Sequence, residues 1–315
     1  MPLRLLSSLG QLIITLFIAT VILFALLRVM PGDPAVVALG VNATPEALDQ
    51  WRERYGIDQP LVLQYFDWAG GLLRGDFGDS YVLQENISAL VIDRTQVTLL
   101  LVITAMVLAL VIAIPVGTLA AIRHRNASGA IISGVSQVGV AVPNFLVGVL
   151  LIALFAVNLG WFPSGGWVAP ADDFGEFVRR IFLPALALGS VQASVMTRYV
   201  RSAVLEIMRE DFLRTARAKG LTSNAALVRH GLRNAGIPVL TVVGVQLATM
   251  LVGAVVIERV FVIPGLGSLL VDSVSNRDLI AVQGVGVMLV LLVVLINFLV
   301  EITYSLFDPR LRKAA

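Results

Sequence analysis

The side chains that most often carry out chemistry are scarce in this sequence. There is no cysteine, and the two histidines are His124 and His230. A disulfide, a thiol nucleophile and a thiolate metal site are therefore excluded, and a histidine metal centre lacks ligands. Both histidines fall in loops between apolar runs, so a Ser–His or Cys–His pair inside those runs has no candidates. We predict that the chain is not an enzyme.

Other reactive patterns are equally weak. The sequence has no Gly-x-x-x-x-Gly-Lys-Ser/Thr run, so it cannot hold ATP phosphates by that loop. The adjacent pair Asp172 and Asp173 could bind a cation, but a solvated loop is the favoured interpretation. Glu301, within an apolar run, is expected to snorkel or pair with an arginine; a proton relay would need a second buried acid. No basic patch interleaved with aromatic residues suggests nucleic-acid binding.

One stretch concentrates the polar residues. The segment 201–238 holds seven of the 23 Lys and Arg residues and three acids, Glu206, Glu210 and Asp211. It is the longest polar, basic segment between two strongly apolar runs. Basic side chains in such a place are suited to contact with another protein, and they also satisfy the excess of positive charge found on the inner face of membrane proteins.

The remainder of the chain predicts an all-α polytopic membrane protein. Its residues are 57% hydrophobic and 14% charged, against about 45–50% and about 25% in soluble domains. A bilayer core takes ~20 apolar residues as a helix. Six runs qualify, the third being long and interrupted by Pro143 and therefore expected to kink: 9–30, 96–121, 131–160, 181–200, 237–257 and 281–306.

Loop charges predict the orientation. Lys and Arg dominate the loops on the side of the N-terminus, while acids dominate the other side. By the positive-inside rule, both termini are expected in the cytoplasm. The first run is too long for a signal-peptide core and is expected to be retained. The predicted divisions are 1–30, an outer segment 31–95, a five-helix core 96–306 that contains the inner loop 201–236, and a tail 307–315.

The inner loop has its own local signals. Arg201 to Lys219 contains neither proline nor glycine, so we expect the fourth span to continue through it as one helix. Gly220 is a helix stop, and Thr222-Ser223-Asn224 offers caps for a new short helix. Asn234-Ala235-Gly236 is expected to end that helix before Pro238 opens the fifth span.

The short helix is predicted to have two faces. Ala225, Val228 and Leu232 line an apolar stripe, and Arg229 and Arg233 form a basic row four residues apart. A helix of this kind can bind in a groove of a soluble partner. The alternative is that the basic residues only satisfy the positive-inside rule.

The outer segments also carry helix signals. Thr44-Pro45-Glu46 begins one helix that Gly56 can close. Pro60 begins a second one, with Leu61, Tyr65, Trp68 and Leu72 on one face, which Gly75 stops. This segment is either a cap packed on the spans or a docking surface for an external partner.

Two further sets of residues are candidates for a role in a pathway through the bilayer. The Pro-Gly-x-Gly turn after the fifth span predicts a hairpin lip and a short helix to Val274; alternatively it is a gate, with Glu258, Pro264, Gly265 and Gly267. Polar groups within spans either line a pathway or join helices by hydrogen bonds. They include Asn144, Gln192 and Gln246.

Several motifs together resemble one family. Arg214-Thr215-Ala216-Arg217-Ala218-Lys219-Gly220-Leu221, followed by Arg229-His230-Gly231-Leu232-Arg233-Asn234, resembles the coupling loop of bacterial ABC importer permeases. The family's glutamate position is Arg214 here and its Leu-Pro close is displaced to Pro238, as is typical of the first permease of the dipeptide/oligopeptide/nickel branch. That branch is also matched by Pro31-Gly32-Asp33-Pro34, Gly75-Asp76-Phe77-Gly78, Pro264-Gly265-Leu266-Gly267 and Leu306-Phe307-Asp308-Pro309-Arg310.

The resemblance implies a type I ABC importer permease in the bacterial cytoplasmic membrane. It implies a second homologous permease, two cytoplasmic ATPase subunits that carry ATP and Mg, and an extracytoplasmic binding protein that delivers short peptides. Nickel, glutathione or another small solute is the alternative cargo. The residues implied to couple to the ATPases are Arg214, Thr215, Ala216, Lys219, Gly220, Leu221, Ala225, Val228, Arg229, Leu232 and Arg233.

A self-contained channel or ion-coupled transporter is the rival from another class. Such a protein needs buried charges along its path, and only Glu301 and Arg28 qualify as candidates. It would also transport without ATP.

Overall fold

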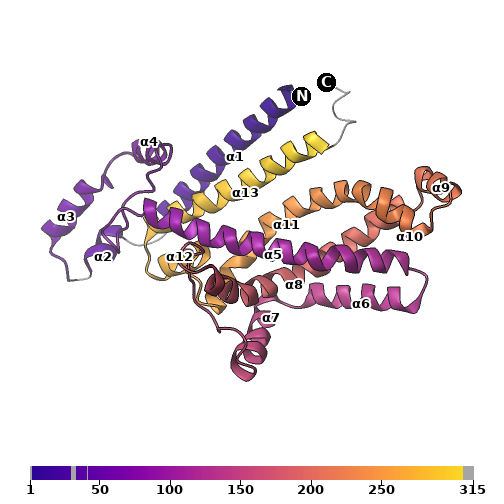
Figure 1. The fold of residues 1–315 in the computed structure, drawn as a ribbon. Helices are drawn as coiled ribbons and strands as arrows, with labels where there is room; N and C mark the ends of the chain where they lie inside the picture. The colour runs from indigo at the N-terminus through magenta and orange to yellow at the C-terminus, as the bar shows by residue number, and fades with distance from the viewer. Residues whose placement is uncertain (1, 30–32, 41, 308–315) are drawn as a thin grey trace. The chain divides into compact units, whose positions relative to one another are not determined.

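The computed structural model describes residues 2–29, 33–40 and 42–307 (Figure 1). These residues form helices and connecting loops, with one isolated antiparallel bridge between Asp79 and Asn86. The expected all-α fold is therefore confirmed. Pro31, Gly32 and the part of the predicted tail from residue 308 onward lie outside the described residues.

Among the described residues, five single helices are long and apolar enough to cross a membrane. Each predicted span except the third corresponds to one of them. The helices of the fourth and fifth predicted spans extend beyond those spans toward the inner loop, to Ile207 and from Leu232. The five are α1 (Pro2–Val29), α5 (Ser88–Ile122), α8 (Phe174–Ile207), α11 (Leu232–Val260) and α13 (Leu279–Phe307).

The third predicted span is a broken helix. α6 (Ala127–Ala141) and the pair formed by α7 (Asn144–Leu151) and the π-helix η1 (Ile152–Asn158) meet at a bend of 97°. Pro143 disfavours helical backbone at the preceding residue, and Val142 is accordingly extended, with φ −82° and ψ 125°. The kink predicted from Pro143 is confirmed, and the spans number six if the broken pair counts as one.

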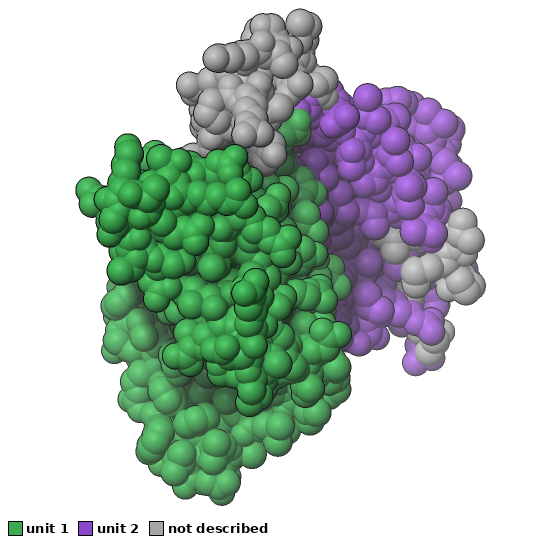
Figure 2. All heavy atoms as spheres, turned by 90° about the vertical axis from the view of Figure 1, so that its right-hand side faces the viewer, with its two compact units in different colours: residues 1–5, 99–263, 296–315 green, residues 6–98, 264–295 purple. Residues whose placement is uncertain are grey.

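The described chain divides into two compact units, which Figure 2 colours separately. Unit 1 contains residues 99–263 with both ends of the chain, and unit 2 contains residues 6–98 and 264–295. In unit 1, α8 packs against α6, α7 and α11. It also lies close to α5, because a β-carbon at Gly189 would stand 2.6 Å from the carbonyl oxygen of Ala105. That helix pair can approach so closely only because residue 189 has no side chain.

Unit 2 contains the short helices of the outer segment. They are α2 (Pro34–Leu39), α3 (Pro45–Arg54) and α4 (Leu61–Leu72), and α12 (Leu266–Ser275) follows the fifth span. Thr44 caps α3 by accepting a hydrogen bond from the Ala47 amide at 3.3 Å, as predicted. Tyr65 and Trp68 of α4 contact Phe24 of α1, while Leu61 is 57% exposed. α4 therefore packs on the first span through its aromatic residues.

A buried carboxylate holds the outer segment to the start of the last span. Asp278 accepts hydrogen bonds from the hydroxyl of Ser80 and the amide of Tyr81. It also accepts from the Ala281 amide in the first turn of α13, at 3.3 Å. All three contacts lie within unit 2, so residues 80–81 are fixed against the N-terminus of α13 by charge-assisted hydrogen bonds.

Candidate functional site

The inner loop forms a hairpin that begins where α8 ends, at Ile207. The Arg209 amide donates to the carbonyl oxygen of Glu206 and the Glu210 amide to that of Ile207, which closes a turn over 208–210. A separate helix, α9 (Asp211–Ala218), follows. The prediction of one continuous helix from Arg201 to Lys219 is therefore wrong. The turn folds α9 back so that Leu213 is only 3% exposed and joins the apolar cluster around α8, whereas a straight helix would carry it into water.

The end of α9 and the start of the next helix follow the local signals. Gly220 has φ +98°, a backbone conformation in which residues with a side chain are strained. Its amide donates to the Arg217 carbonyl, and the Thr222 hydroxyl accepts from the Ala225 amide at 3.3 Å. The short helix α10 (Ser223–Ala226) begins there. The stop at Gly220 and the cap at Thr222 are confirmed.

The second arm of the hairpin joins the fifth span without a break. α10 passes into a π-helical turn, η2 (Leu227–Gly231), and α11 begins at Leu232. The prediction that Asn234-Ala235-Gly236 ends the short helix is wrong, because α11 runs through these residues and through Pro238. Ala235 and Val239 are buried in the cluster around α8, and this burial offsets the poor helix propensity of glycine and proline.

The hairpin is held by an inner face of small and aliphatic residues. Leu213, Ala226, Leu227 and Ala235 pack in one cluster with the α8 residues near Val200. A β-carbon at Gly231 would stand 3.3 Å from Cγ2 of Ile207 and 3.5 Å from Cδ1 of Leu213. The absence of a side chain at Gly231 thus allows both arms to approach the end of α8.

The prediction of an apolar stripe on the short helix is wrong. Ala225 is exposed, Val228 is 65% exposed and Leu232 is half-buried. The buried residues are instead Ala226, Leu227, Gly231 and Ala235, of which the last three recur every four residues. A π-helical turn holds more residues than an α-helical turn, so it rotates the face that meets α8. Sequence spacing assigned with the α-helical period could not reveal this rotation.

The outer face of the hairpin contains most of the predicted coupling residues. Ala216 and Leu221 are half-buried, like Leu232. Phe212, which sequence reasoning missed, is 38% exposed; a signal was available, because Phe212 and Leu213 are adjacent and only one can face inward. The predicted residues that are exposed are Arg214, Thr215, Lys219, Gly220, Ala225, Val228, Arg229 and Arg233.

This outer face is basic. Arg214 pairs with Asp211 at 3.2 Å, and both side chains are well exposed. Arg217, Lys219, Arg229 and Arg233 form no ion pair within 4 Å with any acid in the described part of the hairpin. An exposed valine and phenylalanine among unpaired cations suit contact with a partner that presents an apolar groove with acidic edges.

The predicted lip after the fifth span is packed rather than exposed. Glu258 is fully buried in unit 1, where its carbonyl accepts from the Ile263 amide at 2.8 Å. In unit 2, Gly265 and Gly267 are buried and Pro264 is half-buried; the short helix predicted to Val274 is confirmed as α12. Val262, in the part of this segment that belongs to unit 1, is exposed and has φ +52°. A gating role for the predicted set stays a prediction.

The three polar pathway candidates lie on three helices that contact one another, α7, α8 and α11. Asn144 approaches α11, because its Nδ2 would stand 3.0 Å from a β-carbon at Gly253. Gln192 is buried, and its Oε1 has no hydrogen-bond partner among the described residues. Gln246 is half-buried on α11.

Comparison with known families decides the class. The family described as "Binding-protein-dependent transport system inner membrane component" matches residues 113–313, and the N-terminal family of the same transport systems matches residues 3–102. The chain belongs to this family. The permease is thus the inner-membrane component of a transport system that depends on a binding protein and on ATPase partners.

The permease resembles named relatives over almost its whole length. It is 39% identical to the "Oligopeptide transport system permease protein AppB" of Bacillus subtilis (strain 168), and the aligned region covers 93% of each chain. It is 39% identical to the "Di/tripeptide transport system permease protein DppB" of Pseudomonas aeruginosa (strain UCBPP-PA14), over 96% of this chain and 97% of the relative. It is 38% identical to the "Glutathione transport system permease protein GsiC" of Escherichia coli O1:K1 / APEC, over 96% of both chains.

Proposed function

We propose that the permease imports short peptides, which an extracytoplasmic binding protein delivers to it. The observation that carries this proposal is its resemblance to permeases named for oligopeptides and di/tripeptides, over more than nine-tenths of the chain. Glutathione is a second candidate cargo, because one similar relative is named for it.

The proposed assembly contains a second, homologous permease and two ATPase subunits that bind ATP and Mg. Both termini of the permease and its hairpin 208–233 face the cytoplasm, as the loop charges predict. The hairpin places Ala225, Val228 and the row of Arg229 and Arg233 in a surface groove of one ATPase. The exposure of these residues supports this contact, since a helix bound in a groove needs an unburied apolar side chain and charged neighbours.

Movement of the ATPase passes from the hairpin to two spans. η2 continues into α11 without a break, and α8 joins α9 through the short turn at 208–210. The cluster around Leu213 and Leu227 fixes both arms to the end of α8. Close-packed side chains transmit displacement rather than absorb it. ATP-driven closure of the ATPases therefore tilts α8 and α11 and alternates access to the pathway.

We place the pathway beside α7, α8 and α11. Asn144, Gln192 and Gln246 are its proposed lining residues. The Gln192 Oε1 supports this placement, because a buried carbonyl oxygen needs a donor and none of the described residues supplies one. The proposed outer gate consists of Glu258, Pro264, Gly265 and Gly267. The outer segment 31–95, the core 96–306 and the tail from 307 keep their predicted boundaries in this scheme.

Reconstitution tests the function. The permease is incorporated into proteoliposomes with its second permease, its ATPases and the binding protein, and uptake of radiolabelled dialanine and glutathione is measured with and without ATP. We expect dialanine uptake that needs both ATP and the binding protein. Glutathione uptake alone would favour the second candidate. Equal uptake without ATP would favour the channel or ion-coupled transporter.

A further inference from the structure

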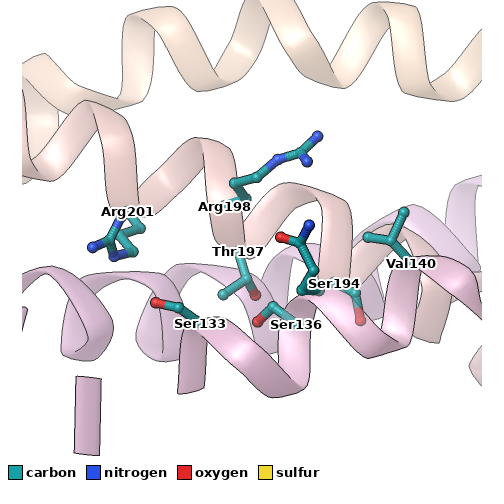
Figure 3. Close-up of a pocket in the computed structure, with 8 residues that line it drawn as sticks. Ser133, Ser136, Val140, Ser194, Thr197, Arg198 and Arg201 are labelled. Carbon is teal, nitrogen blue, oxygen red and sulfur yellow. The ribbon is translucent and has the colours of Figure 1, made fainter. Parts of the chain in front are cut away.

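A pocket of about 140 Å³ lies between α6 and α8, within unit 1 and outside the hairpin (Figure 3). Hydroxyl side chains and arginines form most of its wall, and none of the described residues that line it is acidic. It is lined principally by Ser133 and Ser136 from α6 and by Ser194, Thr197, Arg198 and Arg201 from α8.

Close helix contacts on either side define this pocket. α6 and α8 touch at Gly139, where a β-carbon would stand 2.2 Å from the Oγ of Ser194. α8 also touches α5, because a β-carbon at Gly117 of α5 would stand 2.7 Å from the Thr197 carbonyl oxygen. α8 is therefore held between α5 and α6, and the space lined by Ser133 and Arg201 is an opening between packed helices.

The serine hydroxyls that line the pocket donate their hydrogen bonds to backbone carbonyls of their own helices. Ser133 donates to the Gly129 carbonyl at 2.8 Å and Ser136 to the Ile132 carbonyl at 2.9 Å, each within α6. Ser194 likewise donates within α8, to Ser190 at 3.2 Å. Their protons are used inside their own helices, so they do not bond across the pocket.

The guanidinium of Arg201 has one buried nitrogen that makes no hydrogen bond to the described residues. This nitrogen is Nε, and it lacks an acceptor. Arg198 lines the same pocket, although Figure 3 shows its side chain directed away from α6, and its guanidinium lies 5.6 Å from the Tyr199 ring centroid. A buried guanidinium N–H without an acceptor is costly, and the group that best satisfies it is a planar or tetrahedral oxyanion.

We propose that the pocket between α6 and α8 binds an oxyanion, a carboxylate or a phosphate, through Arg201. Arg198 adds positive potential but no direct hydrogen bond. Two sources present this chemistry: the carboxylate of a small solute that passes through the permease, and the phosphate of a lipid headgroup. The proposal goes beyond the peptide assignment and does not depend on it.

The absence of cysteine allows a direct chemical test. Ser133→Cys places one thiol of this chain in the pocket wall. The assembled transporter is purified in dodecyl maltoside, which carries no charge. The thiol is allowed to react with one of two methanethiosulfonate reagents, an anionic one that bears a sulfonate or a cationic one that bears a trimethylammonium group. Mass spectrometry measures the rate of each reaction. We expect the anionic reagent to react faster than the cationic one.

Arginine variants identify the source of that preference. Arg201→Gln should lower the ratio of the two rates by about tenfold, as loss of one hydrogen bond to a charged group implies. Arg198→Gln should lower it less, and it remains informative if Arg201→Gln does not assemble. Arg209→Gln, the matched control, removes an exposed charge outside the pocket and should leave the ratio unchanged. An unchanged ratio in both pocket variants would overturn the proposal.

Protection of the thiol distinguishes the two sources. Dialanine is compared with dialaninamide, and phosphatidylglycerol with a neutral galactolipid. Protection by dialanine but not by its amide identifies a solute carboxylate, and protection by phosphatidylglycerol alone identifies a lipid phosphate. If neither dialanine nor phosphatidylglycerol protects the thiol, the pocket is not an oxyanion site.

Discussion

Leu213 of α9 lies against Gly231 of η2, with its Cδ1 3.5 Å from where a β-carbon of residue 231 would be. Ile207 and Leu227 approach the same point, at 3.3 Å and 2.7 Å. This contact joins the first arm of the hairpin to the second at the end of α8. The hairpin therefore behaves as one packed body rather than as a loose loop.

Gly231→Val should weaken the hairpin. The added atoms would overlap Leu227 and Ile207, and overpacking of this kind costs about 1–3 kcal/mol. We expect lower stimulation of ATP hydrolysis by loaded binding protein, with the spans still inserted. Gly236→Val is the matched control, because nothing lies within 4 Å of a β-carbon there. Equal stimulation in the two variants would show that this contact does not matter for coupling.

Leu227 and Val228 offer a test of the two faces of the hairpin. Leu227 is 1% exposed and Val228 is 65% exposed. Leu227→Ala removes buried methyl groups and should destabilise the hairpin by about 2–5 kcal/mol. Val228→Ala should leave the thermal unfolding temperature unchanged and reduce the amount of ATPase that co-purifies. The assignment of the faces is wrong if Val228→Ala destabilises the permease as much as Leu227→Ala.

Gly220 should tolerate substitution poorly for reasons of backbone conformation rather than space. Nothing lies within 4 Å of a β-carbon at residue 220, but φ is +98°. A β-branched residue forced into this region costs on the order of 1–3 kcal/mol. We expect Gly220→Val to reduce ATPase stimulation, whereas Gly134→Val, in an open helical position with no positive φ, should not. The measurement is the rate of ATP hydrolysis with saturating loaded binding protein.

The outer segment should loosen in acid. A side-chain hydrogen bond from Arg52 holds the pKa of Asp33 below its ordinary 3.8, helped by the Ala35 amide. Asn86 and the Gly78 amide do the same for the pKa of Asp76. Because both pKa values are lowered by folding, the stabilisation is present above about pH 3.8 and is lost as pH falls through the folded values.

Hydrogen exchange can follow that loss. Protection of the α2 amides, corrected for intrinsic exchange, should fall in acid below about pH 3.8. Asp33→Asn cannot titrate, so protection in this variant should depend less on pH. Constant protection of α2 in the unsubstituted permease down to about pH 2 would contradict this account.

The sequence predicted the features that local chemistry decides. Pro143 breaks the third span, Gly220 stops α9 and Thr222 caps α10, because each acts through the backbone of its own neighbours. The family motifs also reached the correct class, since they extend along the whole chain.

Tertiary packing decided the features that the sequence did not reveal. Neither proline nor glycine marks the turn at Met208, where Leu213 gains burial against α8. The stop expected at Asn234-Ala235-Gly236 is overridden by the burial of Ala235. The π-helical turn then moved the buried face to Leu227, so the predicted apolar residue Val228 became an exposed one.

The central claim is that the outer face of the hairpin receives an ATPase subunit. Because the chain has no cysteine, Val228→Cys provides a single site in this chain for a short thiol-to-amine cross-linker in native membranes. The account predicts a cross-link between this position and a nucleotide-binding ATPase, whose yield changes when ATP and vanadate are added, and none from the buried Leu227→Cys. Equal labelling from both positions, or no ATPase cross-linked to Val228→Cys, would contradict it.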